Sequence, residues 1–444
     1  MEYIIIGGDA AGMSAAMQIW KYDQEAKITV FEQGDTYSYG QCGLPYYIGG
    51  QVDELDDLIS RTADEFQQMF GMKTYTNTRV DQIDAENKLV KVKDLVSGRL
   101  FQKQYDKLLI ATGGRASIPP FPGTDLEGVY TLKTVHDAEA IANSLEAEVK
   151  HVTVIGGGYI GLEMVESFKK RGFHVRMIVR GAYPGAIFDE ELAGMIVDEA
   201  KRQGVLLHTN ENTLALKGKG TVEAVVTDQG SYETDLVLLA TGLKANTEIA
   251  EKAKLSLGVN KGILVNEHLE TSVKDIYAAG DCALHYHRLL KKDVHIPLGT
   301  TANKQGRIAG MNMVGQERRF KGIVGTSIIQ FFNLSLGKVG LNEKELQKEK
   351  IDYEAVTVQS NDIASYYEGV AQITAKLTYD QQTRRLLGGQ IIGEKGVDKR
   401  IDVLVLALTM GMTIDDLEDL DLSYAPPYNS VWDVLQRASR KAKG

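Results

Sequence analysis

The stretch Glu2-Tyr3-Ile4-Ile5-Ile6-Gly7-Gly8-Asp9-Ala10-Ala11-Gly12 decides the fold class of this chain. Its β-branched run predicts a strand, its glycines predict a tight turn, and residues 13–21 predict a helix. Gly7 permits the turn and Gly12 lets the helix pack close to the strand. The free N–H groups at the helix N-terminus then face a pyrophosphate. Asp9 replaces the middle glycine of the G-x-G-x-x-G pattern.

The same design recurs at Val152-Thr153-Val154-Ile155-Gly156-Gly157-Gly158-Tyr159-Ile160-Gly161, which completes the fingerprint. The two copies differ at the end of the next strand, where a side chain meets the adenosine ribose. The first copy has Glu32, which can accept hydrogen bonds from a ribose diol. The second has Val179 and then Arg180, which can pair with a 2′-phosphate where an acid would repel it. We therefore expect NADPH to be accepted, alone or alongside NADH.

Three apolar segments with small-residue ends indicate that one of the two nucleotides is a flavin. They are residues 108–113, 237–242 and 276–281, and the last ends in Gly280-Asp281. A carboxylate at this place can approach the ribityl chain of a flavin. The predicted fold is α/β, with two Rossmann-like domains that bind FAD and NAD(P) and a C-terminal α+β dimerisation domain.

The order of these signals along the chain predicts where each domain begins and ends. The proline-rich stretch 118–123 is a plausible crossing between domains. We expect the FAD domain in two parts (1–115 and 246–322), a connecting segment (116–149), the NAD(P)H domain (150–245) and the dimerisation domain (323–444).

Composition excludes several classes of function. The 444 residues carry a net charge of −10, which argues against a broad nucleic-acid surface. No apolar run approaches the roughly 20 residues of a membrane span. Two cysteines in so long a chain fit a reducing compartment, so a cytoplasmic protein is expected.

Cys42 lies in Ser38-Tyr39-Gly40-Gln41-Cys42-Gly43-Leu44-Pro45-Tyr46-Tyr47, and the other cysteine, Cys282, is far away in sequence. Two cysteines a few residues apart would close into a redox-active disulfide, but here the partner is missing. A lone cysteine can hold its oxidising equivalent as a mixed disulfide, a persulfide or a sulfenic acid. Cys282, just after Asp281, is expected to be a packing residue without a role in the chemistry.

Over essentially its whole length the chain resembles the flavin-dependent pyridine nucleotide–disulfide reductases, specifically their single-cysteine branch. It is most similar there to the coenzyme A disulfide reductases. Two segments carry the resemblance: Gln41-Cys42-Gly43-Leu44-Pro45-Tyr46, and Tyr424-Ala425-Pro426-Pro427-Tyr428, which follows Lys399-Arg400-Ile401-Asp402-Val403-Leu404. The sequence departs from the pattern at Ala10, where peroxidase and oxidase members have a histidine. It also has Gln41 where asparagine is common.

The resemblance implies a mechanism. FAD lies between the nicotinamide and Cys42, and the Cys42 thiolate attacks a disulfide to leave a Cys42–S–S–CoA mixed disulfide, so CoA can be attached covalently. The chemistry requires a thiol of lowered pKa, and we expect Cys42 near a helix N-terminus and against the flavin, both of which can favour the thiolate. The resemblance further implies a homodimer in which Tyr366 and Tyr424 of the partner subunit reach the active site as proton donors.

The resemblance also implies the residues that contact each ligand, and no metal is expected. The implied cofactor contacts are Gly7, Gly8, Ala11, Gly12, Glu32, Gln33, Cys42, Val80, Ala111, Thr112, Gly113, Gly156, Gly158, Tyr159, Ile160, Gly161, Glu163, Arg180, Gly242, Gly280, Asp281, Thr301 and Ala302. The implied CoA contacts are Met13, Gln18, Lys21, Ser38, Gln41, Asn303 and Tyr424.

Three functions remain open at this point. The first is an NAD(P)H-dependent coenzyme A disulfide reductase. The second uses the same scaffold on polysulfide, CoA persulfide or oxygen, as an NADH oxidase does, although Ala10 counts against peroxide. The third is a redox sensor that holds CoA on Cys42 without rapid turnover.

Overall fold

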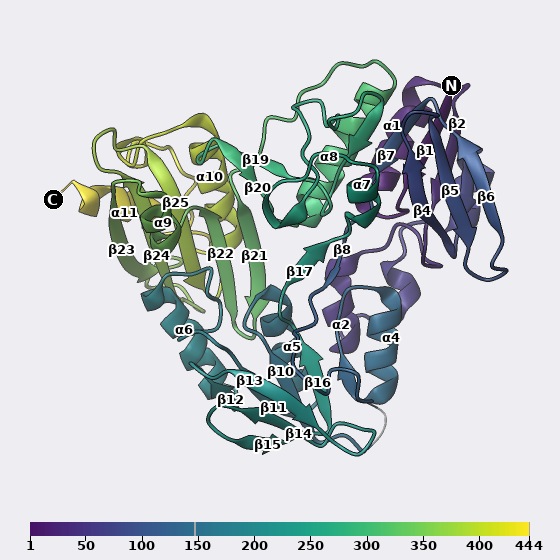
Figure 1. Ribbon diagram of the computed structural model, residues 1–444. Coiled ribbons are helices and arrows are strands. Elements are labelled where there is room, and N and C mark those ends of the chain that lie inside the picture. Colours follow the sequence, from purple (N-terminus) through teal and green to yellow (C-terminus); the bar gives the residue numbers. More distant parts are fainter. Residues whose placement is uncertain (146–147, 444) are drawn as a thin grey trace.

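The structure is a computed structural model that describes residues 1–145 and 148–443. Residues 146–147, in the expected connecting segment, and residue 444, at the end of the expected dimerisation domain, lie outside the described residues. Figure 1 shows three bodies: an N-terminal one in purple with a green return, a central one in blue and teal, and a C-terminal one in light green and yellow.

The first body is built on a five-stranded sheet of order β18-β7-β1-β2-β3, in which all neighbours are parallel. Tyr3 and Ile5 lie in the cluster with the helices, whereas Ile4 and Ile6 pack against an antiparallel sheet of order β4-β5-β6. The strands are β1 (Glu2–Ile6), β2 (Lys27–Phe31), β3 (Lys73–Tyr75), β4 (Thr78–Asp84), β5 (Leu89–Asp94), β6 (Leu100–Gln104), β7 (Lys107–Ile110) and β18 (Ile276–Ala278).

Helix α1 (Ala10–Tyr22) packs very closely against α8 (Gly299–Met313) on one face of this sheet. A Cβ atom on Gly306 would lie 2.1 Å from the carbonyl oxygen of Ala11, so only glycine allows the approach. The remaining elements of this body are α3 (Ala63–Phe70), α7 (Glu248–Lys252), β19 (His285–His287), β20 (Lys292–Val294), and the short η1 (Gln41–Gly43) and η3 (Val259–Lys261). Helix α2 (Leu44–Ile48) and the short η2 (Leu55–Leu58) extend from this body and pack against the apolar core of the second body.

The second body repeats the design with a parallel sheet of order β12-β11-β10-β16-β9. Two antiparallel strands, β8 (Gly114–Ala116) and β17 (Leu243–Ala245), form the double crossing that joins it to the first body. Its elements are β9 (Val129–Tyr130), β10 (His151–Ile155), β11 (His174–Ile178), β12 (Leu206–His208), β13 (Thr213–Lys217), β14 (Ala224–Thr227), β15 (Ser231–Glu233), β16 (Leu236–Leu239), α4 (Val135–Ser144), α5 (Tyr159–Lys170) and α6 (Glu190–Arg202).

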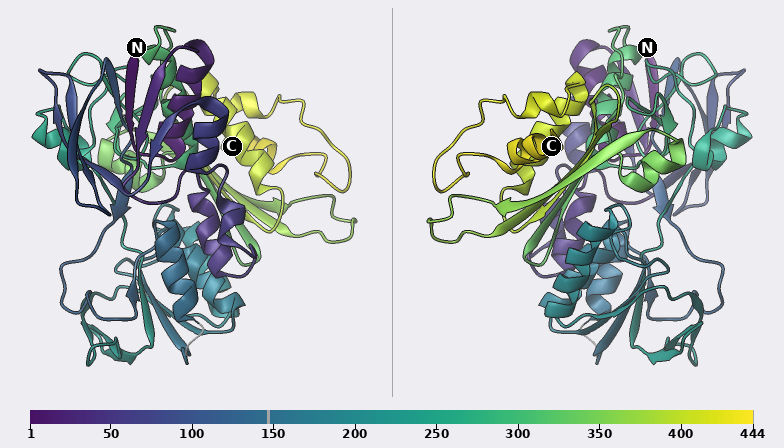
Figure 2. Two further views of the ribbon diagram at one scale, coloured as in Figure 1. Left: turned by 90° about the vertical axis from the view of Figure 1, so that its right-hand side faces the viewer. Right: turned by 90° about the vertical axis from the view of Figure 1, so that its left-hand side faces the viewer.

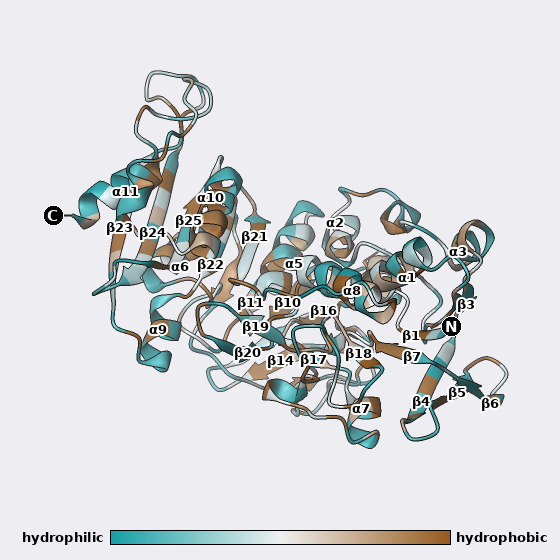
Figure 3. Cartoon of the chain, turned by 90° about the horizontal axis from the view of Figure 1, so that it is seen from above, coloured by the Kyte–Doolittle hydropathy of each residue, from teal (hydrophilic) through white to brown (hydrophobic). Residues whose placement is uncertain are grey.

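The C-terminal body is an antiparallel sheet of order β21-β22-β25-β24-β23, covered by α10. In Figure 3, α10 carries brown apolar turns beside teal polar ones, as expected for a helix with one buried face. Its elements are β21 (Thr326–Phe331), β22 (Leu334–Gly340), β23 (Tyr353–Asn361), β24 (Gln372–Asp380), β25 (Leu386–Gly393), α9 (Glu343–Glu349), α10 (Val397–Met410), α11 (Val434–Ala442) and η4 (Asp415–Leu417).

The predicted fold class is confirmed: two Rossmann-like units precede a C-terminal α+β unit. In the described part of the chain, no helix has both the length and the apolar character needed to cross a bilayer. Cys282 is fully buried among the apolar residues of the first body, as expected for a packing residue.

Candidate active site

The backbone of the first glycine turn lies very close to neighbouring backbone atoms. Gly7 has φ of 113°, and a Cβ on it would lie 2.1 Å from the carbonyl oxygen of Ala111. A Cβ on Gly12 would lie 1.9 Å from the oxygen of Gly7. Both positions therefore require glycine, and Ala10 to Gly12 form the first turn of α1 beneath the loop. This is the geometry that receives a pyrophosphate at a helix N-terminus.

The Glu32 carboxylate is fixed beside this turn. Its Oε2 accepts a hydrogen bond from the N–H of Gly8 at 2.8 Å, and its Oε1 accepts one from Gly34 at the same distance. The neighbouring loop is attached to the same turn, since Ser38 N–H donates to the Gly8 oxygen at 3.0 Å. The carboxylate lies where the sequence places an adenosine ribose.

The second glycine turn has the same construction. Gly156 has φ of 114°, and a Cβ on Gly161 would lie 2.2 Å from the Gly156 oxygen. Gly158, at the N-cap of α5, has open space where its Cβ would be. Tyr159 beside it is hydrogen-bonded to Ser327 of the C-terminal sheet. Arg180 lies exposed two residues beyond the end of β11, and its pairing with a 2′-phosphate stays a prediction.

The double crossing between the two bodies is held by Asn246, which the sequence analysis missed. Thr112 Oγ1 donates to the Asn246 oxygen at 2.6 Å, and Asn246 Nδ2 donates back to the Thr112 oxygen at 3.0 Å. Asn246 N–H also donates to Gly113 at 3.0 Å. The predicted cofactor contacts at 111–113 therefore sit at the junction of the two bodies. Gly242, with φ of 110°, lies at the start of the second crossing strand.

Cys42 lies in η1, immediately before α2, as expected for a cysteine near a helix N-terminus. The following Gly43 packs against Leu58, whose Cδ2 would lie 2.3 Å from an added Cβ. Cys42 has an exposed surface and Cys282 is fully buried, although the groups around Cys42 also partly desolvate its thiol.

The protein groups around Cys42 do not by themselves supply the expected lowering of its thiol pKa. Partial burial raises the pKa of the Cys42 thiol, and the negative charge of Glu163 on α5 raises it further. Burial also raises the pKa of Glu163 to about 7, with a smaller contribution from Glu166. Lys133 is the cation that lowers the pKa of Cys42.

Lys133 is a second residue beside the candidate site that the sequence analysis did not single out. Its Nζ donates to Gln41 Oε1 at 2.7 Å and pairs with Asp281 Oδ2 at 3.0 Å. Gln41 Nε2 in turn donates to Asp9 Oδ2 at 3.0 Å, and burial raises the pKa of Asp9 to about 6. One hydrogen-bonded network thus joins Asp9 of the first glycine turn, Gln41 next to Cys42, and Asp281, the acid predicted to approach the ribityl chain. The one feature of the sequence that could have pointed to Lys133 is its place directly before Thr134, the N-cap of α4.

The predicted CoA contacts fall mainly on the adjoining surfaces of α1, α8 and the 38–41 loop. Asn303 Oδ1 accepts a hydrogen bond from Ser14 Oγ at 2.7 Å, which joins α8 to α1. Lys21 is exposed at the end of α1 and Gln18 is half-buried. Met13, in contrast, is buried in the core, so its contact with CoA remains an unsupported prediction.

The two predicted tyrosines meet each other but do not meet Cys42 within one chain. Tyr366 Oη and Tyr424 Oη are 3.2 Å apart, and both side chains are exposed. Figure 2 shows the green and yellow loops of the C-terminal body extending away from the rest of the chain. A hydrogen bond with Tyr366 raises the pKa of Tyr424. Their entry into the active site of a partner subunit stays a prediction.

The remaining predicted contacts lie in varied surroundings. Val80 is buried between the two sheets of the first body and Gln33 is exposed. Ile160 is exposed at the start of α5. The contacts around the start of α8 are Ala11, Gly280, Thr301 and Ala302, and Gly280 N–H donates to buried Gln305 at 2.9 Å.

Comparison with known proteins identifies the family. Residues 1–306 match the pyridine nucleotide-disulphide oxidoreductase family, and residues 326–434 match the dimerisation domain of that family. The chain belongs to the pyridine nucleotide-disulphide oxidoreductases. The predicted recognition is therefore confirmed at the level of the family. Its members use FAD and NAD(P)H, and the dimerisation domain indicates a homodimer.

Within this family the chain is similar to proteins with different named substrates. It is 38% identical to a CoA-dependent NAD(P)H sulfur oxidoreductase of Pyrococcus abyssi, over 99% of this chain and 98% of the relative. It is 31% identical to a coenzyme A disulfide reductase of Staphylococcus aureus, over all of both chains. A solved NAD-dependent persulfide reductase of A. fulgidus superposes with a TM-score of 0.98 at 37% identity, over all of this chain and 83% of that one.

The first and second glycine turns of this oxidoreductase have the backbone geometry that two dinucleotides need. Each turn has positions where a Cβ would collide with a backbone oxygen, and each opens onto a helix N-terminus. Gly8, Glu32 and Asp281 would hold FAD, and Gly158 and Arg180 would hold NAD(P)H. FAD, when bound, supplies the passage of electrons from reduced nicotinamide to sulfur.

Proposed function

We propose that the protein reduces coenzyme A disulfide to two CoA thiols with NAD(P)H, through a mixed disulfide on Cys42. The observation that carries the proposal is the isolation of one exposed thiol. Cys42 stands at the start of α2, whereas Cys282 is buried in another part of the first body. An internal disulfide between them would require rearrangement of that core. The oxidised state of Cys42 is therefore a mixed disulfide, a persulfide or a sulfenic acid, and a mixed disulfide with CoA is the state that we propose.

The steps balance as thiol–disulfide exchange. The Cys42 thiolate attacks one sulfur of CoA disulfide, the old S–S bond breaks and the first CoA leaves as a thiolate. Two electrons from NAD(P)H and one proton then convert Cys42–S–S–CoA into the Cys42 thiolate and the second CoA thiol. Lys133 supports the anionic form of Cys42, because its positive charge is the protein charge that opposes Glu163 and Asp281.

The proton for the leaving thiolate comes from the tyrosine pair in this proposal. Tyr366 and Tyr424 share a hydrogen bond at the exposed tip of the C-terminal body, so one hydroxyl can donate while the other stabilises it. Both would enter the active site of the partner subunit, where Ser38, Gln41 and Asn303 would contact the CoA moiety.

A CoA persulfide or polysulfide is the second candidate substrate. The names of the Pyrococcus relative and of the A. fulgidus persulfide reductase favour it. The Cys42 thiolate would attack the outer sulfur of such a substrate, break its S–S bond and expel the CoA thiolate or the shortened polysulfide. Two electrons from NAD(P)H and one proton would then convert the Cys42 persulfide into the Cys42 thiolate and hydrosulfide.

Intact-mass measurement with turnover assays tests the proposal. Holoenzyme exposed to CoA disulfide should gain one reductant-sensitive CoA adduct, which Cys42→Ser should lack and the buried-thiol variant Cys282→Ser should retain. NADPH should then be consumed in step with release of two thiols. A persulfide adduct with faster turnover of CoA persulfide would replace the first candidate with the second. Consumption of NADPH by oxygen alone, or an adduct without turnover, would overturn both in favour of an oxidase or a sensor.

A further inference from the structure

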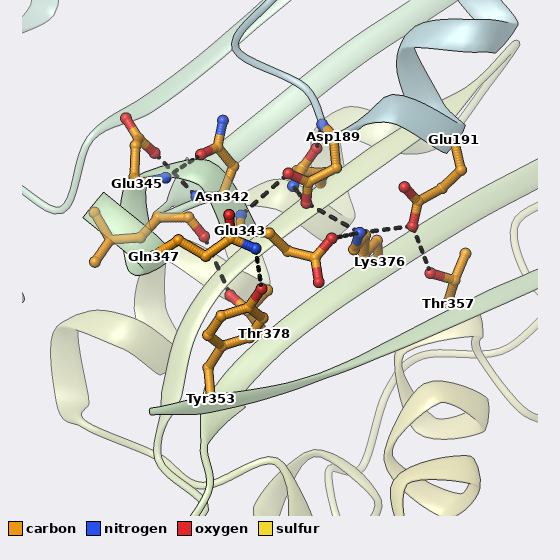
Figure 4. Close-up of polar contacts among 12 residues, drawn as sticks. Asp189, Glu191, Asn342, Glu343, Glu345, Gln347, Tyr353, Thr357, Lys376 and Thr378 are labelled. Atoms are coloured by element: carbon orange, nitrogen blue, oxygen red, sulfur yellow. Dashed lines mark hydrogen bonds and ion pairs between the residues drawn. The ribbon is translucent and has the colours of Figure 1, made fainter. Parts of the chain in front are cut away.

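Lys376 is a buried lysine that contacts three carboxylates at the boundary between the second and C-terminal bodies. Its side chain is only 3% exposed, on strand β24. Its Nζ lies 2.5 Å from Glu343, 2.6 Å from Glu191 and 3.2 Å from Asp189 (Figure 4). No residue of this cluster belongs to the site described above.

The carboxylates come from two different bodies. Asp189 and Glu191 stand at the start of α6 in the second body, whereas Glu343 opens α9 in the C-terminal body. Further polar contacts cross the same boundary. Gln390 exchanges two hydrogen bonds with Asp189, at 2.5 and 2.7 Å, and Asn342 Nδ2 donates to the Ile187 oxygen at 2.9 Å.

The charges of the cluster depend on this one lysine. Three carboxylates carry three negative charges against a single positive one, and Asp189 is as buried as Lys376. Burial disfavours the charged form of Lys376, yet hydrogen bonds with Glu191 and Glu343 raise its pKa above the ordinary value. Loss of Lys376 would leave like charges facing one another across the boundary, with a buried one uncompensated.

Residues 181–189 form the segment that this cluster fixes at its end, Asp189. The same segment contacts the second glycine turn, where the nicotinamide dinucleotide is proposed to bind. Midway, the Gly185 N–H donates to the oxygen of Gly157 in the second glycine turn, at 2.7 Å. A Cβ on Gly157 would lie 3.0 Å from Cα of Pro184, so segment and turn are in close contact. A shift of the start of α6 would therefore move the surface that lies against the dinucleotide.

We propose that Lys376 is a positioning residue for the nicotinamide dinucleotide, which ties the 181–189 segment to the C-terminal sheet and so keeps the second glycine turn and Arg180 in their binding geometry. This inference rests on the proposed NAD(P)H site and is independent of the sulfur substrate. Its effect should appear in dinucleotide affinity, because Lys376 itself touches neither Cys42 nor the first glycine turn.

Anaerobic stopped-flow reduction of the flavin by NADPH, without any disulfide, tests the inference on holoenzyme. Lys376→Met should raise the apparent Kd for NADPH by about five- to tenfold, with little change in the limiting rate of reduction. Lys376→Gln keeps hydrogen-bond donors but no charge and should give an intermediate rise. It also serves as the test if the methionine variant does not yield folded flavoprotein.

Two further variants separate positioning from general stability. Lys338 gives a comparison within one body, because it is also buried on the C-terminal sheet and pairs at 2.7 Å with Glu345, whose side chain is 44% exposed. Lys338→Met should lower the melting temperature without changing the Kd for NADPH. Adding Glu191→Gln and Glu343→Gln to Lys376→Met removes the repulsion and should restore most of the affinity.

The outcomes are distinct from those that test the proposed function. If the wild-type flavin is not reduced by NADPH or NADH, the proposed function itself fails. If the wild-type flavin is reduced and Lys376→Met binds NADPH as tightly, Lys376 has no positioning role. An equal loss in Lys338→Met, or no rescue by the two glutamine substitutions, would likewise reduce Lys376 to a residue that only stabilises the fold.

Discussion

Arg400 is predicted to hold together both loops that carry the exposed tyrosines. Its side chain is 2% exposed on α10 and donates four hydrogen bonds. The acceptors are Asp433 Oδ2 at 2.7 Å, the Asp362 oxygen at 2.8 Å, Asn429 Oδ1 at 2.9 Å and the Gly396 oxygen at 2.9 Å. One guanidinium therefore joins the loop before Tyr366 and the loop after Tyr424, which have no regular structure of their own.

The cost of removing Arg400 follows from the burial of its partner. The Asp433 side chain is also 2% exposed, and among the described residues it keeps only the Leu435 N–H as a donor without Arg400, at 2.9 Å. Breaking such a buried pair by deleting one partner costs about 3–5 kcal/mol, so Arg400→Met should lower the free energy of unfolding by about 4 kcal/mol. The two loops should lose their fixed geometry as well.

A matched pair in the same body gives the control. Arg384 pairs with Asp415 at 2.5 Å, but these side chains are 31% and 35% exposed. Arg384→Met should therefore cost less than about 1 kcal/mol. Urea unfolding followed by circular dichroism measures both variants. Disulfide turnover should fall sharply in Arg400→Met while flavin reduction by NADPH persists. Equal losses of stability in the two variants, or full turnover with Arg400 replaced, would refute this reasoning.

Three further predictions concern the nucleotide and thiol sites. Arg180→Ala should raise the KM for NADPH about tenfold and leave that for NADH nearly unchanged; parallel changes in steady-state assays would remove Arg180 from the 2′-phosphate site. Glu163→Gln should lower the pKa of Cys42 and speed its alkylation by iodoacetamide, but only above about pH 7, because below the raised pKa of Glu163 this carboxyl is already neutral. Lys133→Met should do the reverse, raising the pKa of Cys42 and slowing alkylation at neutral pH; an unchanged pH profile would show that Lys133 does not act on the thiol.

The sequence predicted those features that depend on neighbouring residues. Gly7 and Gly156 are required by a turn whose strand and helix adjoin it in sequence, so both dinucleotide sites could be recognised directly. Lys133 could not be found in this way, because its partners Gln41 and Asp281 lie 92 and 148 residues away. The protein groups around Cys42 could not be predicted for the same reason. The local rule of a helix N-terminus predicted a lowered pKa, but burial and Glu163 of another body raise it.

Two lysines fix the position of the second body relative to its neighbours. Lys133 directly precedes α4, whose buried face belongs to the core of the second body, and it pairs with Asp281 of the first. Lys376 of the C-terminal body pairs with Asp189 of the second. Buried ion pairs of this kind contribute more to relative orientation than to stability, because their desolvation offsets most of their attraction. The second body is thus tied to the first body through Lys133 and to the C-terminal body through Lys376.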